Sequence, residues 1–225
     1  MTGEDLREGR KRRGWTQTDL ARRLGVSQGY VCLLERGQRP VPLSIAQKVT
    51  RVLDMRATAL PLRATSSPLA EHAVTTVLAT LGYPGFAYRR RGKGLNPAEL
   101  ILRSLKATNL DARIVEALVW VALTYADLDW EWLVRQAKLD DLQNRLGFLV
   151  TLARQLAEQR GNAEVSARLA RTEQALEYSR LQREDAFRLS MTEAERTWLR
   201  QHRSPEATRW NVLTNIDASE LARGF

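Results

Sequence analysis

Two short helical segments joined by a glycine turn are the feature of this sequence that most constrains its fold. Thr16 is suited to cap the first segment, which runs to Leu24, and Gly25 can end that segment in a left-handed turn. Ser27 is suited to cap the second segment, which covers residues 28–36. One face of each segment is apolar, through Leu20, Ala21, Leu24, Val31 and Leu34. The spacing predicts a helix-turn-helix within a compact helical bundle.

This stretch resembles the Xre/Cro/phage-repressor family of helix-turn-helix domains over about residues 4–53. The residues at family spacing are Gly14, Thr16, Gln17, Leu20, Ala21, Leu24, Gly25, Val26, Ser27, Val31, Glu35 and Gly37. The resemblance implies a four- or five-helix bundle that binds duplex DNA, usually as a dimer. It also implies the DNA-contacting residues, which are Thr16, Gln17, Ser27, Gln28, Gly29, Tyr30, Cys32, Leu33, Arg36 and Arg39.

Within this set, Gln28 is the expected main contact to a base. Its side-chain amide offers a donor and an acceptor side by side, which match N7 and N6 of adenine. Tyr30 would contact a thymine methyl group or a phosphate, and the resemblance places Gln17 against a backbone phosphate. Further phosphate contacts without sequence information are expected from Arg36 and Arg39 and from the basic run Arg10, Lys11, Arg12 and Arg13.

Three residues depart from the family pattern. Gly9 stands where the family has a buried leucine-like residue, and it weakens the first helix by about 0.5–1 kcal/mol. Leu33 on an exposed face would lose a phosphate or base contact. Cys32 is either a small groove-facing side chain or a redox-sensitive thiol beside basic groups. The alternative interpretation of the motif is a degenerate bundle kept as a protein-docking surface.

Positive charge is concentrated at the same end of the chain. The 225 residues include 35 Lys and Arg against 26 Asp and Glu, a formal charge of +9. Residues 1–56 hold 12 basic and 6 acidic groups, whereas residues 57–225 hold 23 and 20. A basic N-terminal segment followed by a segment of nearly balanced charge indicates a nucleic-acid-binding module joined to a second domain. An anionic membrane is the less favoured partner for the basic segment.

The sequence shows no constellation for catalysis or metal binding. It has no HExxH, P-loop or GxSxG motif, so we expect no enzymatic activity, no cofactor and no metal. Cys32 is the single cysteine, which excludes a disulfide framework. The longest apolar run, 117–123, is shorter than the roughly 20 residues of a membrane span, and the N-terminus lacks the apolar stretch of a signal peptide. We expect a cytoplasmic protein with no membrane partner.

Helical periodicity dominates the rest of the chain, which predicts an all-α fold: a repressor-like helix-turn-helix bundle followed by a larger helical domain. The expected division is a DNA-binding domain over 1–60, a linker and loop region over 61–97, and a helical dimerisation or partner-binding domain over 98–225. The expected later helices span 97–107, 111–126, 129–138, 140–160, 163–188, 192–202 and 205–213. Their expected N-caps include Asp111, Asp140 and Thr192.

Two segments after the helix-turn-helix each allow two interpretations. The basic loop with Arg90, Arg91 and Lys93 is either a second contact to the DNA backbone or a solvated loop. The amphipathic helix over 163–188 could pair with itself in a dimer, or it could pack back on its own domain.

Residues 111–215 also resemble the AbiEi-like antitoxins of abortive-infection toxin–antitoxin pairs. The blocks that carry this resemblance are 116–118, 127–130, 142–149, 190–196 and 209–214. It implies an autorepressor that neutralises a nucleotidyltransferase-type toxin, although that family typically carries a winged helix at the front. We therefore expect a sequence-specific repressor of double-stranded DNA, acting as a homodimer on a palindromic operator. The alternative is an antitoxin that binds a toxin protein through its C-terminal helical domain and autorepresses its operon.

Overall fold

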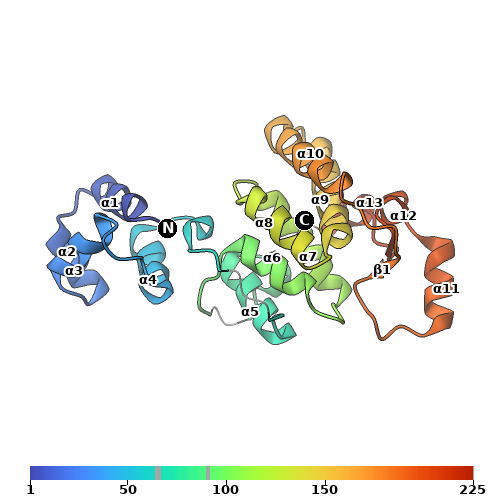
Figure 1. Cartoon of the computed structure of the whole chain (residues 1–225), viewed down its shortest axis with the longest axis horizontal. Helices are drawn as coiled ribbons and strands as arrows, with labels where there is room; N and C mark the ends of the chain where they lie inside the picture. The colour runs from blue at the N-terminus through green and yellow to red at the C-terminus, as the bar shows by residue number, and fades with distance from the viewer. Residues whose placement is uncertain (64–66, 90–91, 225) are drawn as a thin grey trace. The chain divides into compact units, whose positions relative to one another are not determined.

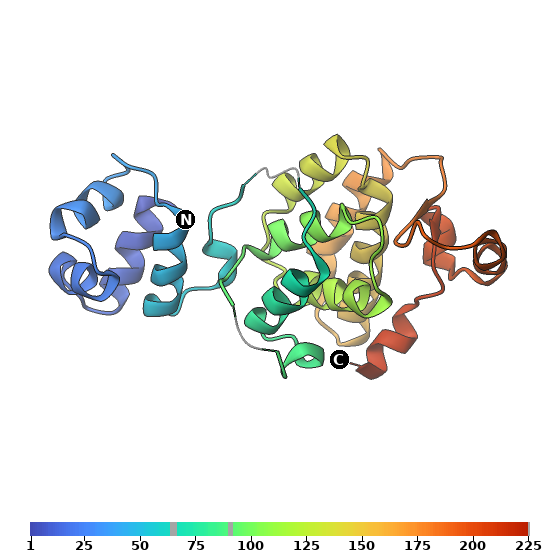
Figure 2. The same ribbon diagram turned by 90° about the horizontal axis from the view of Figure 1, so that it is seen from below.

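Figures 1 and 2 show a chain built almost entirely of helices in this computed structural model, which describes residues 1–63, 67–89 and 92–224. The described residues form thirteen α-helices, two 3-10 turns and two strands of two residues each, so the expected all-α fold is confirmed. Residue contacts divide the chain into two compact units. Unit 1 comprises Met1–Arg63 and Lys93–Asn96, and unit 2 comprises Ala64–Gly92 and Pro97–Phe225. None of the helices in the described ranges has the length and apolar character that crossing a membrane requires.

Unit 1 is a four-helix bundle followed by a 3-10 turn. Its elements are α1 (Gly3–Arg12), α2 (Gln17–Leu24), α3 (Gln28–Glu35), α4 (Leu43–Leu53) and η1 (Ala57–Ala59). Its core consists of Leu6, Leu20, Ala21, Leu24, Val31, Leu34, Val49 and Leu53. Gly9 is buried against the end of α4, where a methyl group would lie 3.0 Å from Leu53 Cδ1 and 3.3 Å from Met55 Sδ. The glycine that weakens α1 therefore allows α1 to approach α4 closely.

The caps and the turn of the helix-turn-helix follow the predicted pattern. Thr16 Oγ1 accepts a hydrogen bond from the backbone N–H of Asp19 at 3.1 Å, and Ser27 Oγ accepts one from the N–H of Tyr30 at 3.2 Å. Gly25 ends α2 with φ of 71°, a left-handed conformation that glycine adopts without steric cost. The predicted boundaries of both helices are confirmed to within a residue.

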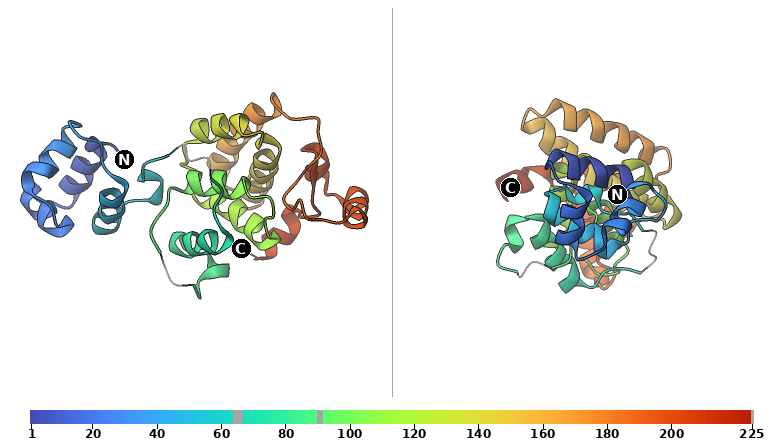
Figure 3. Two further views of the ribbon diagram at one scale, coloured as in Figure 1. Left: turned by 60° about the horizontal axis from the view of Figure 1, so that its bottom comes forward. Right: turned by 90° about the vertical axis from the view of Figure 1, so that its left-hand side faces the viewer.

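Unit 2 is organised around α9 (Gln143–Gln159), which packs against α7 (Ala112–Thr124) and α10 (Ala163–Glu177) (Figure 3). The apolar stripe of α9 is buried, as its spacing predicts, through Leu142, Leu146, Leu149, Leu152, Ala153 and Leu156. The other elements are α5 (Glu71–Leu81), η2 (Pro84–Phe86), α6 (Pro97–Leu105), α8 (Trp130–Leu139), α11 (Glu193–His202), α12 (Pro205–Arg209) and α13 (Ala218–Gly224), with strands β1 (Asp185–Ala186) and β2 (Val212–Leu213). The two strands pair in parallel, with Asp185 opposite Val212.

Trp210 ties the C-terminal segment to α9. Its indole ring is fully buried and lies so close to Gly147 that a methyl group at that position would overlap the ring. Its Nε1–H donates to Thr151 Oγ1 at 2.8 Å, and that hydroxyl donates to Glu173 Oε1 at 2.9 Å. A glycine on α9 thus provides the space for the largest fully buried side chain among the described residues of unit 2.

Four sequence expectations differ from the structure of unit 2. The interval 61–97, expected to be linker and loop, contains α5, because its apolar residues recur at helical spacing and are buried: Val74, Val77, Leu78 and Leu81. Asp140 follows the end of α8 as its C-cap, whereas α9 begins after Leu142. The helix expected over 205–213 ends at Arg209, because Val212 and Leu213 pair with β1.

The helix expected over 163–188 ends at Glu177. The side chain of Asn144 accepts a hydrogen bond from the N–H of Leu181 and donates one to its carbonyl, both at 2.9 Å, and these bonds hold the chain away from helical geometry. Leu169 and Leu176 of α10 are fully buried on its packed face. This helix therefore packs on its own domain, and its pairing with a second copy stays a prediction.

Candidate nucleic-acid interface

The leading end of α3 is open on the surface of unit 1. Ser27, Gln28 and Gly29 are exposed, and Tyr30 is half-buried against the core. The body of α3 is anchored by Val31 and Leu34, which are fully buried. A helix that is fixed along one face and exposed at its N-terminal end has the geometry with which recognition helices enter the major groove.

Four side chains form a continuous chain of hydrogen bonds that leads to this helix end. Arg10 donates to both carboxylate oxygens of Glu35, from Nε to Oε1 at 2.6 Å and from Nη2 to Oε2 at 2.8 Å. Gln17 Nε2 donates to Glu35 Oε2 at 3.0 Å, and Gln28 Nε2 donates to Gln17 Oε1 at 2.7 Å. This series of hydrogen bonds links α1, α2 and α3, and it ends on Gln28, the residue expected to contact a base.

The carboxylate of Glu35 fixes the direction of this chain. Because a carboxylate only accepts hydrogen bonds, Gln17 turns its NH₂ group toward Glu35 and its oxygen toward Gln28. Gln28 must then use one N–H on Gln17, which leaves its Oε1 and its second N–H for another partner. These two groups are the acceptor and the donor that match N6 and N7 of adenine.

Arg10 and Glu35 form an ionised pair at neutral pH. Burial raises the pKa of Glu35, but the hydrogen bonds from Arg10 and Gln17 and the positive charge of Arg10 outweigh burial, so the pKa lies below its ordinary value. The hydrogen bond to Glu35 raises the pKa of Arg10. The side chains are only 11% and 3% exposed, so water competes little for the pair.

The expectation that Arg10 contacts phosphate is wrong. Its guanidinium is taken up by Glu35 and by the carbonyl of Trp15, to which Nη1 donates at 2.7 Å. The sequence did hold a signal for this pair: Glu35 lies four residues after the core residue Val31, so its carboxylate faces inward and requires a partner. Arg12 and Arg13, in contrast, are exposed.

The remaining expected contacts differ in exposure. Arg36 and Arg39 are exposed beyond the end of α3, and Cys32 and Leu33 are half-buried. Thr16 is exposed at the start of α2 and Gln17 is half-buried.

The expected basic loop is only partly described. Lys93 is exposed and belongs to unit 1, next to Gly94, whose carbonyl accepts a hydrogen bond from Gln47 at 2.7 Å. Arg90 and Arg91 lie outside the described residues.

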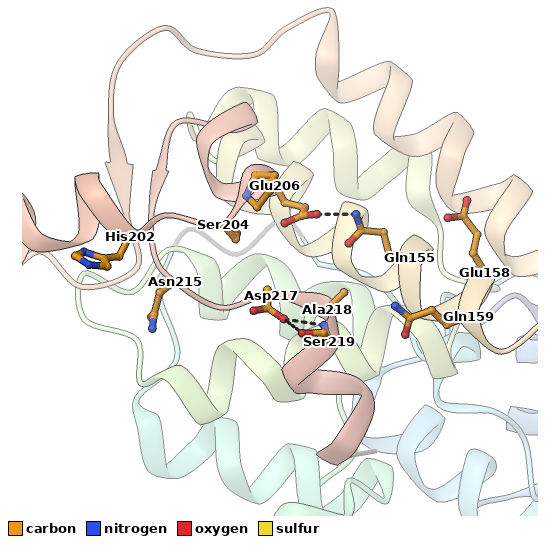
Figure 4. A pocket seen from close by; sticks show the side chains of 11 residues that line it. Gln155, Glu158, Gln159, His202, Ser204, Glu206, Asn215, Asp217, Ala218 and Ser219 are labelled. Carbon is orange, nitrogen blue, oxygen red and sulfur yellow. Dashed lines mark hydrogen bonds between the residues drawn. The ribbon is translucent and has the colours of Figure 1, made fainter.

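Unit 2 contains a polar pocket of about 520 Å³ beside α9 and the segment that leads into α13 (Figure 4). All three carboxylates of its lining have structural partners, and Glu158 is paired with Arg154 at 2.6 Å. Glu206 accepts a hydrogen bond from Gln155 at 2.7 Å, and Asp217 accepts one from the backbone N–H of Ser219 at 2.7 Å. Among the described residues, no cluster of His, Cys, Asp and Glu is arranged to hold a metal ion.

Residues 6–60, from α1 to the end of η1, match a family model described as helix-turn-helix. The match spans about a quarter of the chain, and its family is one of DNA-binding regulatory domains rather than of enzymes. No curated protein and no solved structure matches the chain. Together with the capped α2–α3 pair, the match identifies residues 6–60 as an Xre/Cro-like helix-turn-helix domain, the DNA-binding part of a transcriptional regulator.

Proposed function

We propose that this protein is a sequence-specific repressor that reads its operator through the leading end of α3. The observation that carries the proposal is the chain of hydrogen bonds from Arg10 through Glu35 and Gln17 to Gln28. It orients the Gln28 amide before DNA arrives, so binding loses little side-chain entropy at this residue. Gln28 then contacts adenine in the major groove.

The flanking residues position the helix on the duplex. Arg36 and Arg39 are exposed after the end of α3 and contact phosphates on one side of the groove. Gln17 stands at the start of α2, where its second N–H can donate to a backbone phosphate. These contacts carry no sequence information, but they fix the register in which Gln28 and Tyr30 meet the base pairs.

The repressor acts as a dimer in this proposal, and α11 offers the surface. Trp198 is 50% exposed on this helix and stacks on His202 at 4.2 Å between ring centroids, and Leu189, in the segment that precedes the helix, is 49% exposed. The acidic and basic groups at the two ends of α11 are already paired within the same chain, so the surface that it offers to a second copy is apolar. Two copies packed antiparallel about a two-fold axis would cover Trp198 of each copy. The antitoxin alternative stays a prediction from the sequence alone.

Selection of random duplex oligonucleotides by the full-length protein tests this function. The proposal predicts enrichment of a two-fold symmetric site whose half-sites lie about one helical turn apart. Enrichment of a single, non-repeated site would support sequence-specific DNA binding but contradict the proposal that the protein binds as a dimer. Recovery of no preferred sequence at moderate salt would contradict the proposed function as a whole.

A further inference from the structure

The two helices α8 and α10 of unit 2 border an open groove of about 570 Å³. Its apolar lining comes from Trp130, Val134, Leu139 and Ala175. Leu139 is 74% exposed, although removing a leucine side chain from water is worth about 1.5–3 kcal/mol. A groove of this volume, with mostly apolar walls and a few charged groups, is typical of sites for small ligands.

Three cations stand on the rim of this groove. Arg135 and Lys138 lie one turn apart on α8, and Arg171 comes from α10. In the described part of the chain these three side chains form no ion pair, whereas Arg154 of α9 and Arg168 of α10 are each paired with glutamates. The groove thus gathers positive charge that the protein itself leaves uncompensated.

Among the described residues, Glu131 is the one carboxylate in the lining of this groove. It stands in the first turn of α8, where the positive end of the helix dipole stabilises it. The balance along the rim is therefore three positive groups against one negative group, and the positive groups come from both helices. This balance favours an anionic ligand over a cationic or neutral one of the same shape.

We propose that the α8–α10 groove binds a small amphipathic anion, a molecule with a hydrocarbon or aromatic body and a single carboxylate or sulfonate head. The body would cover Val134, Leu139 and Ala175, which removes apolar surface of both partners from water. The head would meet the rim cations, of which arginine can hold a carboxylate through two parallel hydrogen bonds. This site lies within unit 2 and does not depend on the proposed DNA contacts.

Calorimetric titration of the full-length protein with three ten-carbon ligands tests the chemistry of the site. The ligands are decanoate, decanol and decyltrimethylammonium, each kept below the concentration at which it forms micelles. Decanoate should bind at least tenfold more tightly than decanol, and decyltrimethylammonium should bind more weakly than decanol. Equal affinity for the anion and the cation, or no heat of binding for decanoate, would overturn the proposal.

Variants of the groove test its location. Replacing Arg135, Lys138 and Arg171 together by glutamine should lower the affinity for decanoate at least tenfold and leave decanol binding unchanged. Arg160→Gln, an exposed arginine outside the groove, is the matched control and should change neither.

A second variant separates loss of the groove from loss of charge. Ala175→Trp fills the groove from an exposed position and should abolish binding of both ligands, with an unchanged melting temperature showing that the fold survives. If either groove variant binds decanoate as the unmodified protein does, the site is misplaced. Because no DNA enters these titrations, their failure is separate from a failure of the repressor function.

Discussion

Arg10 of α1 and Glu35 of α3 are joined by two parallel hydrogen bonds of 2.6 and 2.8 Å inside the helix-turn-helix bundle. The desolvation of two charges opposes such a pair, so its contribution to net stability is small or even unfavourable compared with apolar packing. The geometry of the pair also sets the orientation of the neighbouring glutamine side chains. It orients Gln17, and Gln17 orients Gln28 at the exposed end of α3. The pair therefore connects the folding of unit 1 to the proposed contact with a base.

Breaking the pair from one side should destabilise unit 1. Arg10→Met keeps much of the apolar stem but leaves Glu35 buried without its countercharge, which typically costs about 3–5 kcal/mol. Urea unfolding monitored by circular dichroism measures this loss. Arg12→Met, on the same helix but exposed, should change stability by less than about 0.5 kcal/mol. Equal losses for the two variants would show that the pair is not a structural contact.

The same pair predicts a dependence of stability on pH. Since the pKa of Glu35 is lowered by folding, its contribution is complete above the unfolded pKa of about 4.3 and is lost as pH falls through the lower folded value. The difference in unfolding free energy between the unmodified protein and Glu35→Gln should be constant from about pH 6 to 8 and shrink below about pH 4.3. A difference that grows on acidification would contradict the lowered pKa.

Arg36 and Arg39 should affect affinity without affecting sequence preference. Each is expected to contact a phosphate, so replacing either by glutamine should weaken binding to all duplexes alike. Each replacement should also reduce the slope of log K against log salt by about 1. Fluorescence anisotropy at several salt concentrations measures the slope, with Arg160→Gln of unit 2 as the control. A change in the preferred sequence would instead place these arginines at base edges.

Trp198 should govern the oligomeric state. Trp198→Glu introduces a charge into the proposed α11 pairing, and we expect the dimer dissociation constant to rise at least tenfold, or about 1.4 kcal/mol. Sedimentation equilibrium measures this constant. Tyr178→Glu, at an aromatic residue that is 83% exposed outside α11, is the matched control. A protein that sediments as a monomer before any substitution would rule out the pairing.

The helix-turn-helix could be predicted from the sequence because its signals are local. Thr16, Gly25 and Ser27 each act on the backbone within three residues, so their meaning does not depend on the rest of the fold. The predicted exposure of Gln28 follows from the same helix register. The chemistry of a glutamine amide suggested a base contact, and the structure adds the hydrogen bond that orients it.

The features that sequence reasoning missed depend on distant partners. In the sequence, Arg10 is one of four consecutive basic residues and nothing local distinguishes it. Its partner is the carboxylate of Glu35, which lies 25 positions later in the chain. Asn144 ends the predicted long helix by holding Leu181, 37 positions later, and no local pattern distinguishes that asparagine from an ordinary helix residue. Local rules predict where a helix can start, whereas tertiary hydrogen bonds decide where this one stops.

The affinity of the Gln28→Ala variant for the selected operator is the sharpest test of recognition through α3. We expect a loss of about 1–3 kcal/mol on the operator, with binding to unrelated duplex unchanged, because one bidentate contact to adenine disappears. Gln38→Ala, an exposed glutamine beyond the end of α3, should bind both duplexes as the unmodified protein does. Operator affinity that is equal for Gln28→Ala and Gln38→Ala would contradict recognition through the leading end of α3.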